Sequence, residues 1–203
     1  SPQELTLLQR AAEGGNVEAQ WQLGLLYASG QGMPLDYVTA ARWIQSAAEQ
    51  GFTRAQSVLA WLFANGLGVD QDDAAAGRWY LAAAEQGVAK DQFMVATMYR
   101  FGRYGVEVDK ERMLFWYQAA ANQGHTPSQF ALGKMLVQGK TIPADHETAF
   151  QWLSLADING HKQAGEWLRQ LMGTMPAESI EQAKQRMLNP QPELSAAPDM
   201  EGA

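Results

Sequence analysis

The sequence predicts an all-α fold in which helix-turn-helix repeats stack into a right-handed α-α superhelix, or solenoid. Glycines recur with steps of 36, 36, 37 and 36 residues at Gly15, Gly51, Gly87, Gly124 and Gly160. Tryptophans and aspartates recur with steps of 36, 37 and 36 residues, at Trp43, Trp79, Trp116 and Trp152 and at Asp36, Asp72, Asp109 and Asp145. Self-similarity at a period of about 20–50 residues is the signature of a repeat architecture. We therefore expect four copies of one small helical unit.

The first part of each copy has the pattern of an amphipathic helix. In the first copy Ala19, Leu23 and Tyr27 lie four residues apart, which places them on one helical face. One repeat position always carries a small residue that lets two helices approach closely: Gly24, Ala60, Ala96 and Gly133. We expect this segment to be the first helix of each hairpin.

The second part of each copy has the signals of a turn followed by another helix. Glycines that can adopt left-handed turn conformations follow the first helix, as in Gly30-Gln31-Gly32. The repeated aspartate then stands where a side chain can accept bonds from the free N–H groups of a first helical turn. Ala40, Trp43 and Ala47 continue with helical spacing, and Gly51 stands at the expected C-terminal cap. The third copy has one extra residue in its turn, at Arg103-Tyr104-Gly105.

These signals predict one solenoid domain over residues 1–188 with a tail behind it. A half repeat at 4–18 precedes the full copies and a C-terminal cap at 164–188 follows them, because terminal repeats need covering. The tail at 189–203 contains three prolines and three acidic residues, a composition typical of disorder. The predicted copies span residues 19–54, 55–90, 91–127 and 128–163.

One repeated residue type is not explained by helix chemistry alone. Glu13, Glu49 and Glu85 each precede the closing glycine by two residues, where a negative charge meets the negative end of the helix dipole. We expect each carboxylate to accept a hydrogen bond from the neighbouring repeat, which would offset the unfavourable charge.

Composition excludes several classes of protein. The chain has no cysteine, which excludes disulfides, thiolate metal sites and a cysteine nucleophile. The formal net charge is −7 and the basic residues are scattered, so nucleic acid is not an expected partner. No window has the roughly 18 consecutive apolar residues of a membrane-spanning helix. The chain opens at Ser1 rather than methionine, which predicts a processed N-terminus and allows an exported, periplasmic location, with a cytoplasmic one as the alternative.

The sequence does not predict catalysis, a cofactor or a metal site. His125 and His161 each follow a repeat glycine, so they should lie about 10 Å apart, the packing distance of helices, and mark a loop position. The Gly-x-Gly pairs lack the rest of any nucleotide fingerprint. Close carboxylates such as Asp70 and Asp72 surround a helix cap and have no histidine or lysine in phase. No serine stands in a Gly-x-Ser-x-Gly context.

The ordered pattern resembles the Sel-one-like repeat (SLR) family, a relative of the tetratricopeptide repeat with a longer unit. In the second copy the pattern reads Ala55, Leu59-Ala60, Phe63, Gly66-Leu67-Gly68, Asp72, Ala76, Trp79 and Ala83-Ala84-Glu85-Gln86-Gly87. The resemblance covers residues 5–175. It implies a curved solenoid whose first helices line the concave side and hold other proteins, often as exported scaffolds, sensors or inhibitors of secreted toxins.

The positions between the buried ones on the first helices predict where a partner binds. They are spaced three and four residues apart, so they form one stripe along each helix. The predicted partner-binding residues are Gln22, Leu25, Val58, Trp61, Asn65, Met94, Thr97, Phe101 and Lys134, with Arg100 and Tyr104 as a basic and aromatic rim. Aromatic anchors of this kind dominate protein contacts. The alternative is that Trp61 and Phe101 complete the core between hairpins.

The predicted function is therefore a non-catalytic interaction module that binds a protein partner in the concave groove. The expected partner is a secreted effector or an envelope protein, and a sharper hypothesis is an immunity protein that neutralises a secreted effector enzyme. The rival hypothesis from another class is a hydrolase acting on cell-envelope glycans or lactams. The sequence leaves the identity of the partner and the oligomeric state open.

Overall fold

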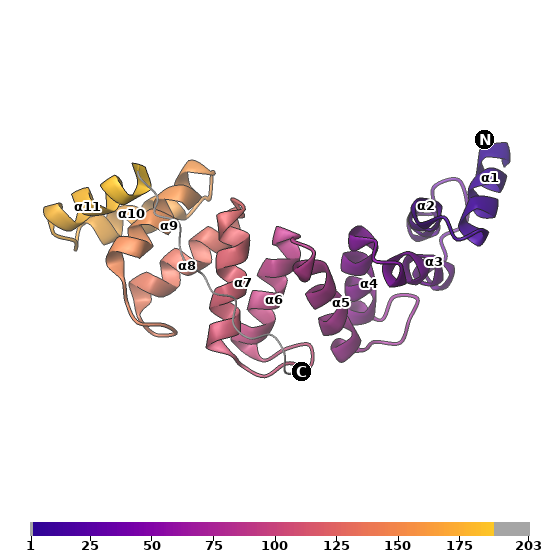
Figure 1. The fold of residues 1–203 in the computed structure, drawn as a ribbon, viewed down its shortest axis with the longest axis horizontal. Helices are drawn as coiled ribbons and strands as arrows, with labels where there is room; N and C mark the ends of the chain where they lie inside the picture. The colour runs from indigo at the N-terminus through magenta and orange to yellow at the C-terminus, as the bar shows by residue number, and fades with distance from the viewer. Residues whose placement is uncertain (1, 189–203) are drawn as a thin grey trace. The chain divides into compact units, whose positions relative to one another are not determined.

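The computed structural model describes residues 2–188, and within that part of the chain the fold is entirely helical (Figure 1). The predicted all-α repeat solenoid is confirmed. The residues 189–203, for which a disordered tail is predicted, lie outside the described part. The helices are α1 (Pro2–Glu13), α2 (Val17–Ser29), α3 (Tyr37–Glu49), α4 (Thr53–Asn65), α5 (Asp73–Glu85), α6 (Ala89–Phe101), α7 (Lys110–Asn122), α8 (Thr126–Gln138), α9 (His146–Ile158), α10 (Ala164–Met172) and α11 (Ala177–Leu188).

The helices divide between two compact units, which we describe separately. Unit 1 contains the described residues up to Asp91 together with Gly102–Glu107. Unit 2 contains Gln92–Phe101 and the described residues from Val108 onwards. None of the helices in residues 2–188 is long and apolar enough to cross a membrane.

The repeated aspartate caps each second helix, as the sequence predicts. The Asp36 carboxylate accepts from the backbone N–H groups of Val38 and Thr39, and its own N–H donates to the Tyr27 carbonyl at 3.0 Å. The cap therefore begins α3 and also joins it to the end of α2. The same side-chain cap is formed by Asp72, Asp109 and Asp145.

In unit 1 the hairpins α2/α3 and α4/α5 pack through small residues. A Cβ atom at Gly24 would lie 2.6 Å from Ile44 Cγ1, so only glycine allows α2 to approach α3 this closely. Ala60, at the same repeat position in α4, is fully buried. The hairpins share an apolar core in which Ile44 and Leu59 have no exposed surface. Close contact along one face leaves the other positions of each first helix outside this core.

The extra residue of the third copy forms a special turn against α5. Tyr104 adopts a left-handed conformation with φ of 57°, and its ring lies 5.9 Å from that of Tyr80 in an edge-on contact. A Cβ atom at Gly77 would collide with the Tyr104 carbonyl oxygen. The inserted residue is therefore accommodated because α5 has a glycine beneath it.

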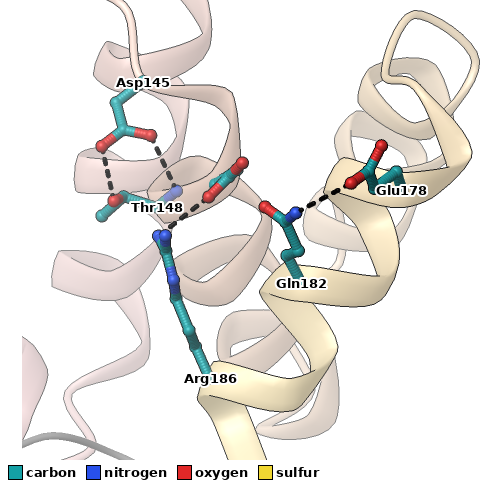
Figure 2. Close-up of polar contacts among 6 residues, drawn as sticks. Asp145, Thr148, Glu178, Gln182 and Arg186 are labelled. Atoms are coloured by element: carbon teal, nitrogen blue, oxygen red, sulfur yellow. Dashed lines mark hydrogen bonds and ion pairs between the residues drawn. The ribbon is translucent and has the colours of Figure 1, made fainter.

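Unit 2 repeats the hairpin packing and ends in a two-helix cap. Gly133 of α8 faces Leu153 of α9, and a Cβ atom there would lie 2.7 Å from Leu153 Cγ. α10 and α11 both pack against α9, with Leu171 and Ala183 buried in the shared cluster. The Arg186 side chain of α11 forms an ion pair of 2.8 Å with Glu147, near the Asp145 cap (Figure 2).

α10 begins like a first helix but does not carry the small residue that the others have. By the repeat spacing, Ala164 corresponds to Ala19 and is fully buried. Arg169 stands where Gly24 and Gly133 stand in α2 and α8, and its side chain is exposed. No second helix packs on this face within residues 2–188, since α11 packs against α9 instead.

The sequence-based expectation for Glu13, Glu49 and Glu85 is wrong. All three side chains are exposed. Glu49 accepts a bond only from Gln45 of its own helix, and among the described residues Glu13 and Glu85 accept no hydrogen bond. A carboxylate only accepts hydrogen bonds, whereas the carbonyls at a helix C-terminus need donors.

Glutamines connect successive repeats instead. In unit 1 the buried Gln56 donates to the Ala48 carbonyl at the end of α3, at 3.3 Å. Its side-chain oxygen accepts at 2.6 Å from Gln86, which follows α5. Gln20 is placed in the same way between Ala12 and Gln50. In unit 2, Gln129 joins the Ala121 carbonyl to Asn159. An amide suits this position because it donates and accepts at once.

Candidate functional site

The predicted stripe of unit 1 lies on α2 and α4 and has two exposed apolar side chains. Leu25 is 40% exposed and Trp61 is 48% exposed. Gln22 and Asn65 are also exposed, whereas Val58 is half-buried and packs on the core. The Asn65 amide donates to the Trp61 carbonyl at 2.7 Å, so it belongs to the same helical surface. The alternative in which Trp61 completes the core does not fit this exposure.

The predicted stripe of unit 2 lies on α6 and α8 and is more varied. Phe101 is 53% exposed, while Met94 and Thr97 are half-buried. The Thr97 hydroxyl donates to the Phe93 carbonyl at 2.9 Å and lies 3.3 Å from the Tyr117 hydroxyl. Thr97 therefore helps to hold α6 against α7, and Phe101 offers the exposed apolar surface.

Two basic residues of this stripe lie over aromatic rings. The Arg100 guanidinium carbon is 5.1 Å from the centroid of the Phe101 ring. The Lys134 ammonium is 5.3 Å from the centroid of the Trp167 ring in α10. Such contacts contribute about 0.5–1 kcal/mol at exposed sites. The stripe of unit 2 is thus both aromatic and basic.

Tyr104 belongs to the turn on α5. It is half-buried, and its ring packs on Tyr80 of unit 1. Burial, together with the neighbouring Tyr104 and Asp91, raises the pKa of Tyr80 to about 12. Arg103, next to Tyr104, is exposed.

Sequence reasoning missed the contribution of Trp167. It lies on α10, outside the four full copies, although the repeat spacing places it at the position of Gln22, Val58 and Met94. Phe130 joins it edge-on at 6.3 Å and stacks on the His161 ring at 3.9 Å. That correspondence is the signal by which the sequence could have added Trp167 to the stripe.

His125 and His161 occupy the same position in successive repeats and contact aromatic rings there. His161 stacks on Phe130, and His125 lies 5.2 Å from the Phe93 ring, in the same way that Phe52 contacts Trp21 in the first copy. Burial lowers the pKa of both histidines. Among residues 2–188 no three histidine, aspartate or glutamate side chains are grouped so as to hold a metal ion.

An open cavity of about 360 Å³ lies between the starts of α9 and α11, lined by Asp145, His146, Glu147, Met175 and Ser179 among others. Its carboxylates are already engaged. Burial raises the pKa of Asp145, but the bonds from Thr148, the Glu147 N–H and the charge of Arg186 together lower it overall. Glu147 is paired with Arg186 (Figure 2). The carboxylates that line the cavity therefore hold α9 and α11 in place, and we do not assign the cavity a binding role.

The geometry defines a helical repeat protein with an exposed apolar and aromatic surface on its first helices. Comparison with family models gives the match "Sel1 repeat" at residues 17–52, 53–88, 89–125 and 126–156. The chain belongs to the Sel1 repeat family, as the resemblance indicated. Each matched copy begins two residues earlier than the frame derived from the sequence.

Two solved structures are similar over most of the chain. One is a protective antigen present in uropathogenic Escherichia coli strains, which displays an SLR fold: it is 32% identical with a TM-score of 0.78, over 91% of this chain and 40% of that one. The other is a Sel1 repeat protein from Oxalobacter formigenes, 27% identical with a TM-score of 0.78, over 92% of this chain and 79% of that one. This chain therefore spans two fifths of the length of the E. coli protein. A comparison with curated proteins gave no significant match.

Proposed function

We propose that this chain is a non-catalytic module that binds a protein partner through the exposed residues of its first helices. Sel1 repeat proteins are generally protein-interaction modules. The observation that carries the proposal is the exposure of Trp61, which is 48% on a helix whose neighbouring Leu59 and Leu62 are buried. A large aromatic side chain held in water by a rigid helix is a typical anchor for a partner.

Loss of Trp61 should abolish partner capture without loss of the fold. The protein is used as bait in the cells that produce it, and captured proteins are identified by mass spectrometry. Trp61→Ala should lower the affinity for a specific partner by about 30-fold, corresponding to about 2 kcal/mol for an anchor residue. Circular dichroism should show an unchanged helical content.

Val38→Ala is the matched control. Val38 is 60% exposed in unit 1, but it lies on the second helix α3. It should leave capture unchanged. Equal capture by wild type and Trp61→Ala, or equal loss with Val38→Ala, would refute the assignment of the surface to the first helices.

We also propose that the chain is exported and that its partner is a secreted or envelope protein, with inhibition of an effector enzyme as the sharper form. The similarity to a protective antigen supports export, because an antigen must be reached by the immune system. Fractionation of the producing cells, followed by immunoblotting, tests this location; a purely cytoplasmic signal would contradict it. No described residue cluster favours the hydrolase alternative.

A further inference from the structure

The stripe of unit 2 has the opposite charge to the protein as a whole. The chain carries a formal net charge of −7. Within unit 2, residues 92–101 of α6 and the whole of α8 contain no aspartate or glutamate, but they contain Arg100 and Lys134. The part of the stripe formed by α6 and α8 is therefore basic in an acidic protein.

The two cations are held on rings and not by carboxylates. Arg100 lies over Phe101, and Lys134 lies over Trp167. Within residues 2–188 neither forms an ion pair. Arg112 of the second helix α7 differs, because it lies over the Tyr99 ring and also bonds the Tyr99 hydroxyl and pairs with Asp109.

A cation on a ring keeps its hydrogen-bond donors. The ring attracts the charge through its π face, but it does not accept the N–H groups at the edge of a guanidinium or the protons of an ammonium. A carboxylate satisfies these donors, and arginine binds it with two parallel bonds. The ring beside each cation meanwhile offers apolar contact, and Phe101 is 53% exposed.

We propose that the unit 2 stripe binds an acidic segment of the protein partner, in which carboxylates flank a large apolar side chain. The carboxylates pair with Arg100 and Lys134, and the apolar side chain packs on Phe101. The acidic residues elsewhere on the chain do not prevent this, because salt screens charges beyond about 8 Å at physiological ionic strength. This proposal rests on the proposed function and specifies the chemistry of the partner.

Two labelled peptides test the proposal by fluorescence anisotropy with the full chain. The acidic probe is Gly-Glu-Glu-Leu-Phe-Glu-Glu-Gly, and its neutral twin has glutamine in place of each glutamate. We expect the acidic probe to bind about tenfold more tightly, with an affinity that falls as salt is raised. Equal affinity for the two probes, or no binding of the acidic one, overturns the proposal.

Substitutions then locate the bound probe. Arg100→Gln and Lys134→Gln should each weaken binding of the acidic probe by about fivefold, and Lys134→Arg, which keeps the charge, should restore it. Lys162→Gln is the matched control, since Lys162 is exposed in unit 2 and lies in the loop before α10, outside the stripe helices α6 and α8. If Lys162→Gln weakens binding as much as the stripe variants, the attraction is general and the proposal fails.

Other occupants of the stripe give different results. If the acidic probe binds only after residues 189–203 are removed, the occupant is the acidic tail of the chain, and an acidic partner is refuted. If Arg100→Gln and Lys134→Gln change the oligomeric state in sedimentation, the occupant is a second copy, which also refutes it. Failure of these tests with intact Trp61-dependent capture would leave the proposed function standing.

Discussion

Asp91 departs from the repeat pattern at a position that is buried. The first two copies carry Ala19 and Ala55 at this position, both buried. Asp91 is only 4% exposed, and the Ser57 hydroxyl donates to its carboxylate at 2.6 Å. Burial raises the pKa of Asp91, while Ser57 and then Lys90 act in the opposite direction. A buried carboxyl with one hydrogen-bond donor favours its neutral form.

The contribution of Asp91 to stability should therefore fall as the pH rises from acid to neutral. The folded-state pKa of Asp91 lies above its ordinary value of 3.8, so the folded state holds the proton more tightly than the unfolded state. The carboxyl contributes stability below pH 3.8 that is lost as the pH rises through the folded-state pKa. Asp91→Ala should remove this dependence and gain stability relative to wild type at pH 7. Urea unfolding at pH 4 and pH 7, followed by circular dichroism, measures the difference.

Ser57→Ala is the companion variant. It removes the hydroxyl that donates to the carboxylate, so the ionised form is less well stabilised and the loss between pH 4 and pH 7 should become larger. If the free energy of unfolding changes with pH equally in wild type and Asp91→Ala, Asp91 does not cause the pH dependence.

At the scale of the helical elements, hydrogen bonds of buried glutamine side chains join the end of one second helix to the next hairpin. The buried residues Gln20, Gln56 and Gln129 each supply a donor to the preceding helix C-terminus and accept from the residue that follows the second helix of the same hairpin. These bonds give a carbonyl at the helix terminus a second donor, beside the N–H of the closing glycine.

Gln56→Ala should lower the free energy of unfolding by about 1–2 kcal/mol, because it removes the bonds to the Ala48 carbonyl and from the Gln86 amide, each of which keeps a second bond to Gly51. Gln56→Glu should cost at least as much at neutral pH, since a carboxylate cannot donate to the carbonyl. Chemical denaturation measures both. Gln22→Ala and Glu85→Ala, at exposed positions, should stay within about 0.5 kcal/mol of wild type. A large effect of Glu85→Ala would restore the original expectation for the glutamates.

The sequence predicted the helices and their caps well, because turn glycines and capping aspartates act locally. Asp36 and Gly51 have the same role in any chain with those neighbours, and the structure places both as expected. The glutamine contacts are different, because they join residues 30 positions apart. Glu49 and Gln50 recur with the same period, and periodicity alone does not show which of two adjacent side chains turns inwards.

At the scale of the whole molecule, residues of each unit contact mainly their neighbours in the array, as expected for a solenoid. The cap of unit 2 is held chiefly by apolar burial. Ala183 of α11 has no exposed surface, whereas the Arg186–Glu147 pair is partly exposed. Exposed pairs contribute about 0–1 kcal/mol, so the packing of α11 dominates.

Ala183→Asp should therefore release α11 while unit 1 keeps its stability. A carboxylate buried without a partner costs several kcal/mol, which is avoided if α11 detaches. Hydrogen exchange with mass spectrometry should show lost protection in α11 and α9, with α2–α5 unchanged. Gln185→Asp makes the same charge change at an exposed neighbour and should leave exchange unaltered. Unfolding of unit 1 together with α11 would contradict a nearest-neighbour array.

The sequence indicated which positions of the first helices are not needed by the core, and Trp61 and Phe101 are exposed as that reasoning requires. Their role in binding stays a prediction. The ring beneath Lys134 could not be predicted, because Trp167 comes from a capping helix whose position depends on packing with α8 and α9.

Arg169 also limits how such a protein can lengthen by gene duplication. Its long side chain occupies the position where a small residue would let another second helix approach α10. A duplicated hairpin inserted between α9 and α10 would meet a surface already adapted to receive a first helix. A hairpin added beyond α10 would have to pack against the Arg169 side chain. We therefore expect new repeats to be gained in the interior of the gene.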